Sequence, residues 1–193
     1  MPAAVILAAG QGSRFRQVAG ADQDKLLAAC RGRDGVVRPV LEQVLLNLPP
    51  GLERRVLVTT AERGQVAELA RAYACQVVLL ESAGMGHSLA AAVAASEEAA
   101  GWLVLLGDMP FILPATVQQV IAAMTEAGIC VPRLGTVLGH PVGFGRAYGK
   151  ALQGLSGDRG AKPLFASGQV LEVSVTDPGV LWDVDRPEAL VYR

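Results

Sequence analysis

Several features that define common functional classes are scarce in this sequence. Of its 193 residues, 5% are aromatic and 18% are charged, and the formal net charge is −1, with no basic run and no acidic tail. A balanced charge exerts no bulk attraction on nucleic acid, so local groups must hold any anionic ligand. We therefore expect no nucleic-acid partner.

Cysteine is scarce as well. Cys30, Cys75 and Cys130 stand far apart, without the CxxC or Cys/His spacing of a structural zinc site. An odd number of thiols and the lack of a signal-peptide layout favour a cytoplasmic protein. The apolar stretch at residues 3–9 is too short to span a membrane, so we expect no membrane contact.

Hydrophobic residues, by contrast, make up 51% of the chain and form short runs that alternate with helical patterns. This order predicts an α/β fold with a mostly parallel wound sheet flanked by helices, in a Rossmann-like arrangement. The expected strands are Ala3–Ala8, Arg55–Thr59, Gln76–Leu80, Trp102–Leu106 and Gly128–Pro132. The expected helices are Pro39–Leu48, Glu62–Tyr73, His87–Ala100 and Pro114–Glu126.

The chain length fits a single domain over residues 1–193. From about residue 133, Gly and Pro become frequent and the apolar runs become shorter. We therefore expect residues 133–193 to be an irregular α+β elaboration of the sheet's rim, and not a second domain.

Glycine and acidic residues follow three of the expected strands. The segments are Gly10–Arg14, Glu81–Ser88 and Gly107–Pro110. In wound α/β sheets, ligands bind outside the carboxyl ends of the strands. The three segments are therefore expected to share one rim and one ligand.

The first of these segments predicts a phosphate-binding turn. Gly10 and Gly12 allow backbone N–H groups to approach a phosphate chain, and Arg14 adds a cationic fork. The segment lacks the third glycine of a dinucleotide fingerprint and the Gly-Lys-Ser/Thr of a Walker loop. A plain tight turn is the alternative.

Carboxylates predict a magnesium site on the same rim. Asp108 ends a buried strand, and Asp183 and Asp185 stand two apart, so an extended backbone turns both side chains the same way. Magnesium prefers one or two carboxylates together with phosphate oxygens. The alternatives are that Asp108 caps the following turn and that Asp185 caps a helix started by Pro187.

Two further segments have both a binding and a structural interpretation. The run Gly84–Ser88 precedes the expected helix and would hold a nucleotide or phosphate; alternatively, Ser88 is only the helix cap. His87 is expected to face solvent. Lys25 either neutralises phosphate charge beside the first turn or is an ordinary surface lysine.

Polar and glycine-rich segments in the C-terminal third also qualify as site elements. His140, within Gly139–Gly143, is either a buried, satisfied side chain or faces a substrate. The turn Gly157–Ala161 carries Asp158; its alternative is a solvent loop with an internal ion pair.

Taken together and in chain order, these motifs resemble the molybdenum cofactor cytidylyltransferases, nucleotidyltransferases with a glycosyltransferase-A-like fold. The motifs are Leu7–Arg14, Lys25, Gly84–Leu89, Gly107–Pro110, Gly139–Val142, Gly157–Ala161 and Asp183–Glu188. The resemblance implies Mg²⁺-dependent transfer of CMP from CTP to the terminal phosphate of molybdopterin, with release of pyrophosphate. It also implies a molybdoenzyme that receives the product.

The same resemblance implies a role for each motif residue. The nucleotide-binding set is Leu7, Ala8, Ala9, Gly10, Gly12, Ser13, Arg14, Lys25, Gly84, Met85, Gly86 and Ser88. The catalytic set is Arg14, Lys25 and Asp108, and the metal ligands are Asp108, Asp183 and Asp185. The acceptor would lie against His140, Pro141 and Asp158, within the C-terminal third.

Two positions refine the resemblance. Ala9 stands where the related guanylyltransferases usually have Gly, which favours cytidine. The family's lysine usually follows the first turn more closely, whereas here residues 16–24 intervene before Lys25. The alternative functions are nucleotidyl transfer to a sugar or polyol phosphate, and a non-catalytic protein that delivers the cofactor.

Overall fold

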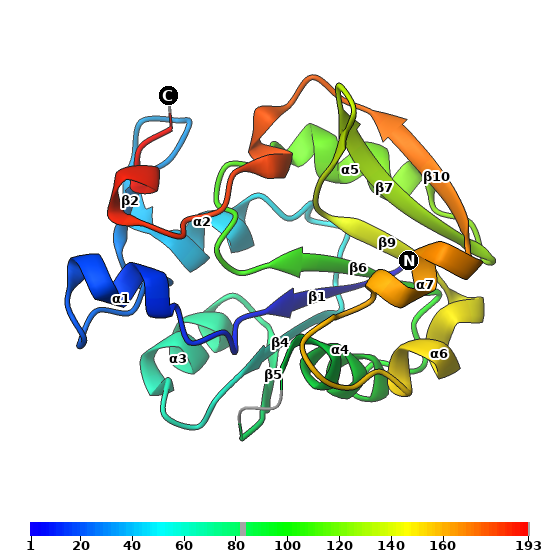
Figure 1. The fold of residues 1–193 in the computed structure, drawn as a ribbon, viewed down its shortest axis with the longest axis horizontal. Coiled ribbons are helices and arrows are strands. Elements are labelled where there is room, and N and C mark those ends of the chain that lie inside the picture. The colour runs from blue at the N-terminus through cyan, green and yellow to red at the C-terminus, as the bar shows by residue number, and fades with distance from the viewer. Residues whose placement is uncertain (82–83, 193) are drawn as a thin grey trace.

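A computed structural model describes residues 1–81 and 84–192 as a wound α/β fold (Figure 1). The main sheet runs in the order β10-β7-β9-β6-β1-β4-β5, and β8 pairs with β7 at the side. Its strands are β1 (Ala3–Leu7), β4 (Arg55–Thr59), β5 (Gln76–Leu79), β6 (Gly101–Leu106), β7 (Gly128–Leu134), β8 (Val137–Leu138), β9 (Val142–Gly145) and β10 (Gln169–Ser174). A separate two-stranded sheet joins β2 (Ala29–Arg31) to β3 (Val37–Pro39).

Seven α-helices and three short 3₁₀ helices are assigned within the described residues. The α-helices are α1 (Ser13–Ala19), α2 (Val40–Leu46), α3 (Gly64–Ala72), α4 (Gly84–Ala94), α5 (Pro114–Ala123), α6 (Gly149–Gln153) and α7 (Lys162–Ser167). The 3₁₀ helices are η1 (Arg146–Tyr148), η2 (Pro178–Leu181) and η3 (Pro187–Leu190). Within residues 1–81 and 84–192, no helix is long and apolar enough to cross a membrane.

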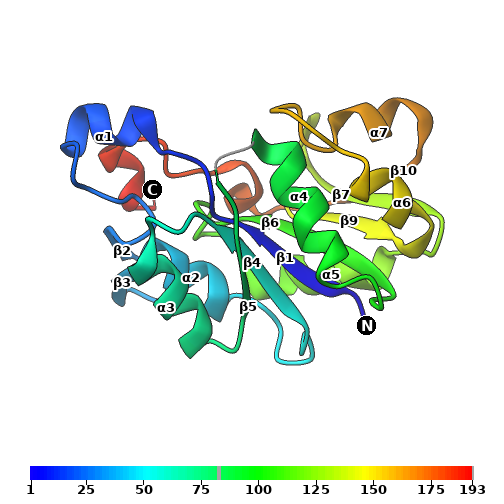
Figure 2. The same ribbon diagram turned by 90° about the horizontal axis from the view of Figure 1, so that it is seen from below.

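Alternation along the strands sends side chains into two apolar layers. In β1, Ala4 and Ile6 pack with residues of α2, α3 and α5, whereas Ala3 and Val5 pack with residues of α4 and α6. Figures 1 and 2 show α4 and α6 together on one face of the sheet, with α5 on the other. Because both faces are covered, the strands are apolar throughout, as in other parallel sheets.

The α/β class and the mostly parallel sheet are confirmed. The pairs β1–β4, β1–β6, β4–β5 and β7–β10 are parallel, and β9 is antiparallel to both of its neighbours. The expectation that the C-terminal third only elaborates the rim is wrong, because β9 lies inside the sheet between β6 and β7. Its short run Val142–Gly145 gave little sign of a fully buried strand.

Strand register brings the site segments to one edge. Leu7 of β1 pairs with Leu106 of β6 and with Val58 of β4, so these strands end together. The Gly107 amide donates to the Leu7 carbonyl at 2.9 Å, and the Ala8 amide donates to the Val58 carbonyl at 2.8 Å. The turn after β1 and the acid after β6 therefore lie side by side.

Candidate active site

The turn after β1 opens onto a cleft. Gly12 has a left-handed backbone (φ +61°) that begins α1, and a Cβ there would lie 3.4 Å from the Lys25 side chain. A Cβ at Gly10 would meet no atom within 4 Å. Gly12 therefore provides the turn and packs against Lys25, while Gly10 leaves open space on the cleft side.

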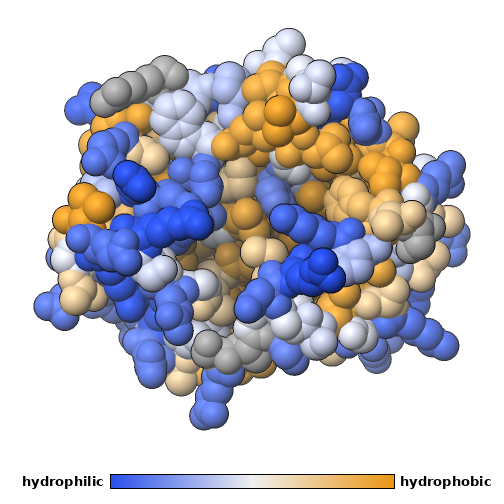
Figure 3. Space-filling view, in the orientation of Figure 1, coloured by the Kyte–Doolittle hydropathy of each residue, from blue (hydrophilic) through white to orange (hydrophobic). Residues whose placement is uncertain are grey.

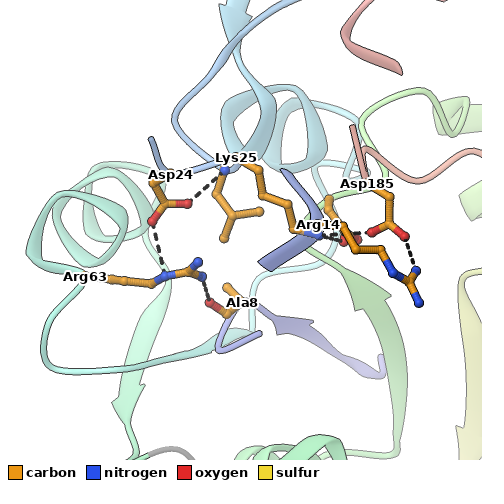
Figure 4. A network of polar contacts seen from close by, with 8 residues as sticks. Ala8, Arg14, Asp24, Lys25, Arg63 and Asp185 are labelled. Carbon is orange, nitrogen blue, oxygen red and sulfur yellow. Dashed lines mark hydrogen bonds and ion pairs between the residues drawn. The ribbon is translucent and has the colours of Figure 1, made fainter. Parts of the chain in front are cut away.

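Lys25 and Asp108 form the centre of the site. Lys25 Nζ lies 2.5 Å from Asp108 Oδ2 and 3.6 Å from Asp185 Oδ1, and Arg14 Nη1 lies 2.6 Å from Asp185 Oδ2 (Figure 4). The Lys25 side chain is only 10% exposed, whereas that of Arg14 is 72% exposed. The surface-lysine alternative is therefore wrong, because a buried ammonium needs the carboxylates around it.

The C-terminal acids reach this centre through a backbone bond. The Val184 amide donates to the Asp108 carbonyl at 2.8 Å, and the Val184 side chain is fully buried. Asp183 and Asp185 flank this anchor. The capping alternative for Asp185 is wrong, since Arg186 occupies the position before η3 and Asp185 instead pairs with Arg14 and Lys25.

The three carboxylates influence one another. Partial burial raises the pKa of Asp183, and the negative charges of Asp185 and Asp108 raise it further, with Lys25 opposing. Like charges gathered in this way attract a cation. Lys25 supplies one positive charge, so the cluster keeps a net negative charge before Arg14 is counted.

The donor set fits a divalent cation that arrives with phosphate. Within the described residues, no group of three or more His, Cys, Asp or Glu side chains is arranged to hold a metal ion, and Lys25 contacts both Asp108 and Asp185. Mg²⁺ needs only one or two carboxylates when waters and phosphate oxygens complete its shell. Asp108, Asp183 and Asp185 supply such oxygens, so they fit a magnesium–nucleotide complex better than a free ion.

A cleft of about 820 Å³ brings most of the expected residues together. Figure 3 shows the hollow in the middle of this face, with hydrophilic residues on both sides. The expected residues that line it are Leu7, Ala8, Ala9, Gly10, Ser13, Arg14, Lys25, Gly84, Met85, Ser88, Asp108 and Asp158. Gly12 and Gly86 do not line it, and Asp183 and Asp185 line an adjoining depression together with Arg14.

The Gly84–Ser88 segment has a different structural role from the one expected. It forms the first turn of α4, so the predicted helix start at His87 is three residues late. The Ser88 hydroxyl donates to the Gly84 carbonyl inside the helix, so the cap interpretation of Ser88 is wrong. Ser82 and Ala83, which precede this segment in the expected motif, lie outside the described residues.

Glycine at 84 and 86 allows a second loop to dock. A Cβ at Gly84 would lie 2.4 Å from an Asp158 carboxylate oxygen, and one at Gly86 would lie 2.6 Å from the Ser156 carbonyl. The Gly86 amide donates to the Gly157 carbonyl at 2.8 Å, and the Gly157 amide donates to His87 Nδ1 at 3.2 Å. The Gly86 amide is thus already used to hold Asp158 at the edge of the cleft.

A smaller, apolar pocket adjoins the cleft. It measures about 290 Å³ and includes His140, with Arg159 and Lys162 as its charged members. The remaining lining residues are apolar or glycine: Leu7, Met85, Leu89, Val104, Leu106, Val131, Leu138, Gly139, Val142, Phe144, Ala161 and Phe165. Such a surface suits a flat ring system more than a polyhydroxylated one.

His140 lines this pocket, and a cis peptide bond joins it to Pro141. Pro141 is buried and is absent from the pocket lining, so the structure does not place this expected acceptor residue against the pocket. Burial lowers the pKa of His140, opposed by the Val104 backbone and by the charge of Asp108. His140 is therefore neutral at pH 7, and its buried Nδ1 has no hydrogen-bond partner among the described residues.

The sequence interpretation missed Arg63 and Asp24. Arg63, just before α3, is 9% exposed and lines both the main cleft and a second cleft of about 570 Å³. Its Nε lies 3.1 Å from Asp24 Oδ2, and its Nη1 donates to the Ala8 carbonyl at 2.7 Å. The available signal was its place four residues after β4, on the rim where ligands bind.

Comparison with known proteins decides the family. The model for the "MobA-like NTP transferase domain" matches residues 4–173. The chain belongs to the MobA-like NTP transferase family. It is 37% identical over 147 residues to "Bifunctional protein GlmU" of Syntrophotalea carbinolica, across 75% of this chain and 30% of that protein. The chain thus spans about 30% of the length of the curated relatives it matches.

Solved structures of similar proteins agree with this membership. The crystal structure of Rv0371c from Mycobacterium tuberculosis H37Rv superposes with a TM-score of 0.76 at 28% identity, covering 98% of this chain and 96% of that one. A second structure, Rv0371C in complex with manganese, gives a TM-score of 0.72 at 28% identity, covering 97% and 94%. MobA-like NTP transferases are nucleotidyltransferases that act on nucleoside triphosphates, so the chain is an enzyme of that class.

Proposed function

We propose that this MobA-like NTP transferase moves CMP from CTP to the terminal phosphate of molybdopterin and releases pyrophosphate. The observation that carries the proposal is the junction of two surfaces. A cluster of carboxylates and cations around Asp108 and Lys25 adjoins an apolar pocket of about 290 Å³. Charge at the reacting phosphates and a dry surface for a flat heterocycle are both needed for this pair of substrates.

In this proposal, the first turn binds the triphosphate. Backbone N–H groups at Gly10, Gly12 and Ser13 face the phosphates, and Arg14 and Lys25 stabilise the charge that develops on the departing pyrophosphate. Asp108, Asp183 and Asp185 would hold Mg²⁺, which neutralises phosphate charge and orients the reacting oxygens when it is bound. The manganese complex of the mycobacterial relative supports a divalent cation of this kind.

The transfer itself needs no protein nucleophile. A phosphate oxygen of the acceptor attacks the α-phosphorus of CTP in line, one P–O bond forms, and the bond to pyrophosphate breaks. The acceptor phosphate is already anionic at neutral pH, so the chain's residues contribute position and electrostatics. His140 and Asp158 would bind the acceptor, and Ala9 favours cytidine over a purine by about 1–3 kcal/mol.

A sugar or polyol phosphate is the second candidate acceptor. Arg159 and Lys162 line the same pocket and suit any anionic acceptor. The apolar side chains beside them offer few hydrogen-bond partners to sugar hydroxyls, and unpaired hydroxyls are costly to bury. The apolar lining therefore favours the pterin.

A pyrophosphate-release assay tests the proposal. CTP, GTP and ATP are each offered with Mg²⁺ to molybdopterin and to a panel of sugar and polyol phosphates. We expect release with CTP and molybdopterin at least tenfold faster than with any other pair. Faster release with a sugar phosphate would overturn molybdopterin as the acceptor. Faster release with GTP would overturn cytosine as the preferred base. A cytoplasmic location and product transfer to a molybdoenzyme belong to the same proposal.

A further inference from the structure

The segment before Lys25 does not by itself fix the lysine. Helix α1 ends at Ala19, and Gly20 follows with φ +116°. Residues 20–23 are exposed and make one internal backbone bond, from the Gln23 amide to the Gly20 carbonyl at 3.1 Å. Lys25 nevertheless delivers its ammonium to within 2.5 Å of Asp108. Its position must come from contacts outside this segment.

Arg63 provides such contacts from the other side of the cleft. Its guanidinium binds the Ala8 carbonyl at the end of β1 through Nη1 and the Asp24 carboxylate through Nε (Figure 4). The Ala8 carbonyl also accepts a bond from the Thr59 hydroxyl at 3.2 Å. Arg63 is therefore attached to the rigid centre of the sheet at one corner and to the neighbour of Lys25 at another.

Both oxygens of Asp24 are used. Oδ2 pairs with Arg63 Nε at 3.1 Å, and Oδ1 accepts from the Leu26 amide at 3.0 Å. The second bond spans Lys25 itself and sets the direction of its backbone. The Arg63 guanidinium, attached to β1, thus holds a carboxylate that in turn binds the backbone amide directly after Lys25.

Burying the charged Arg63 side chain is unfavourable by itself. Desolvation lowers the pKa of Arg63, the charge of Asp24 opposes the shift, and the like charge of Arg16 adds to it. Within the described residues, Arg63 Nη2 is buried without a hydrogen-bond partner. The bonds of the guanidinium to the Asp24 carboxylate and the Ala8 carbonyl offset this desolvation.

We propose that Arg63 is a positioning residue that acts through Asp24 to place Lys25 between Asp108 and Asp185. We call the Arg63–Asp24 pair, with its bonds to Ala8 and Leu26, the latch. It compensates for the residues 16–24 that separate Lys25 from the first turn. The catalytic consequence rests on the proposed function, whereas the placement of Lys25 does not, so the two are tested separately.

A substrate-free measurement tests the placement. Amine acetylation with mass spectrometry reports the reactivity of Lys25, with the exposed Lys150 and Lys162, the chain's other lysines, as internal references. We expect Arg63→Gln and Asp24→Asn to raise Lys25 acetylation at least tenfold relative to the references. Asp24→Asn keeps an oxygen for the Leu26 amide and removes only the charge, so it isolates the ion pair.

Arg55→Gln is the matched control. Arg55 is half-buried and, like Arg63, donates to backbone carbonyls, Leu52 at 3.0 Å and Tyr73 at 3.4 Å, but it lies at the opposite end of β4. Urea denaturation gives the free energy of unfolding of each variant, so that a general loss of stability is separated from release of Lys25. Unchanged Lys25 acetylation in both latch variants, or an equal rise in Arg55→Gln, would overturn the placement.

Activity then tests the catalytic consequence. With whichever nucleotide and acceptor release pyrophosphate, we expect Arg63→Gln to lower kcat with little change in the KM for the nucleotide. Combining it with Lys25→Met should give no further loss beyond Lys25→Met alone. Independent, multiplicative losses would show that Arg63 does not act through Lys25. If no substrate pair is turned over, the proposed function fails while the acetylation result still decides the latch.

Discussion

Two groups of aspartates in this chain show how differently a carboxylate can be held. Asp177 is 3% exposed, and its oxygens contact Arg33 at 2.6 Å, the Leu113 amide at 2.8 Å, the Thr116 hydroxyl at 2.8 Å and the Gly179 amide at 3.1 Å. Apart from Gly179, two residues away, these partners come from distant parts of the chain. Asp177 is therefore a satisfied structural charge that fastens them together.

The rim aspartates, Asp108, Asp183 and Asp185, are more exposed than Asp177 and have different partners. Asp108 and Asp185 are 19% and 36% exposed and are bound chiefly by the ends of two long cationic side chains, Lys25 and Arg14. Asp183 beside them has a raised pKa, caused by burial and by its acidic neighbours. Buried backbone amides cannot exchange partners, whereas side-chain cations can turn to an incoming phosphate. The difference separates carboxylates that maintain the fold from carboxylates available for a ligand.

The largest expected effect is on catalysis, at Asp108. Asp108→Asn keeps the shape of the side chain but removes the charge opposite Lys25 and a proposed metal ligand. We expect kcat/KM to fall by about 10³-fold or more, since electrostatic groups in such sites contribute on this scale. Steady-state pyrophosphate release measures the loss, and circular dichroism checks the fold. Activity within tenfold of wild type would remove Asp108 from the site.

The matching change at Asp177 should affect stability instead. Asp177→Ala removes the carboxylate partner of Arg33 and leaves the buried donors at Leu113, Thr116 and Gly179 unpaired, and breaking a buried pair of this kind costs about 3–5 kcal/mol. We expect urea denaturation to show a loss of that size and kcat per folded molecule to stay within about twofold. A large loss of kcat with unchanged stability would contradict the structural role of Asp177.

Arg14 gives a smaller effect that sharpens the comparison. Its side chain is 72% exposed, so its pair with Asp185 contributes at most about 1 kcal/mol to stability. We expect Arg14→Met to leave the unfolding free energy nearly unchanged and to lower kcat/KM by about 10²-fold. Arg38→Met is the control, because Arg38 pairs with Asp34 at 2.8 Å away from the cleft and should leave kcat/KM unchanged. Equal effects of the two variants would contradict a role for Arg14.

The sequence predicts the rim of this site better than its interior connections. Each strand end could be located because apolar runs stop at glycine or an acid, and parallel strands bring such ends to one edge. The expected strands around β1, β4, β5 and β6 agree with the structure to within one residue at either end. The sequence alone therefore predicts that Asp108 and the Gly10–Arg14 turn lie together.

The contacts that hold the site depend on distances in space that no local pattern encodes. Gly86 looked like a phosphate-binding glycine, yet its amide binds the Gly157 carbonyl of a loop 71 residues later in the chain. Arg63 lies within the expected helix Glu62–Tyr73 and the sequence assigns it no role, yet it bonds to Ala8 and Asp24. Such pairs are set by the packing of whole elements, so only the fold reveals them.

The smallest expected effect, and the most selective, is the pH dependence of stability. The pKa of Asp183 is raised above its ordinary value of 3.8, mainly by burial and then by the charges of Asp185 and Asp108. The folded, metal-free chain therefore binds this proton more tightly than the unfolded chain, so stability falls as pH rises from about 3.8 through the raised pKa. Asp183→Asn should remove that slope and make the chain more stable than wild type above this window.

Asp34 supplies a control of opposite sign. A hydrogen bond from Arg38 lowers the pKa of Asp34 below 3.8, so its contribution is present above that value and is lost as pH falls through the lowered pKa. Urea unfolding in EDTA between pH 3 and pH 7 gives the unfolding free energy of wild type minus that of each variant. The difference should decrease with pH for Asp183→Asn and increase for Asp34→Asn. If both differences run the same way, neither burial nor the neighbouring carboxylates raise the pKa of Asp183, and the distinction between rim and structural aspartates loses its electrostatic basis.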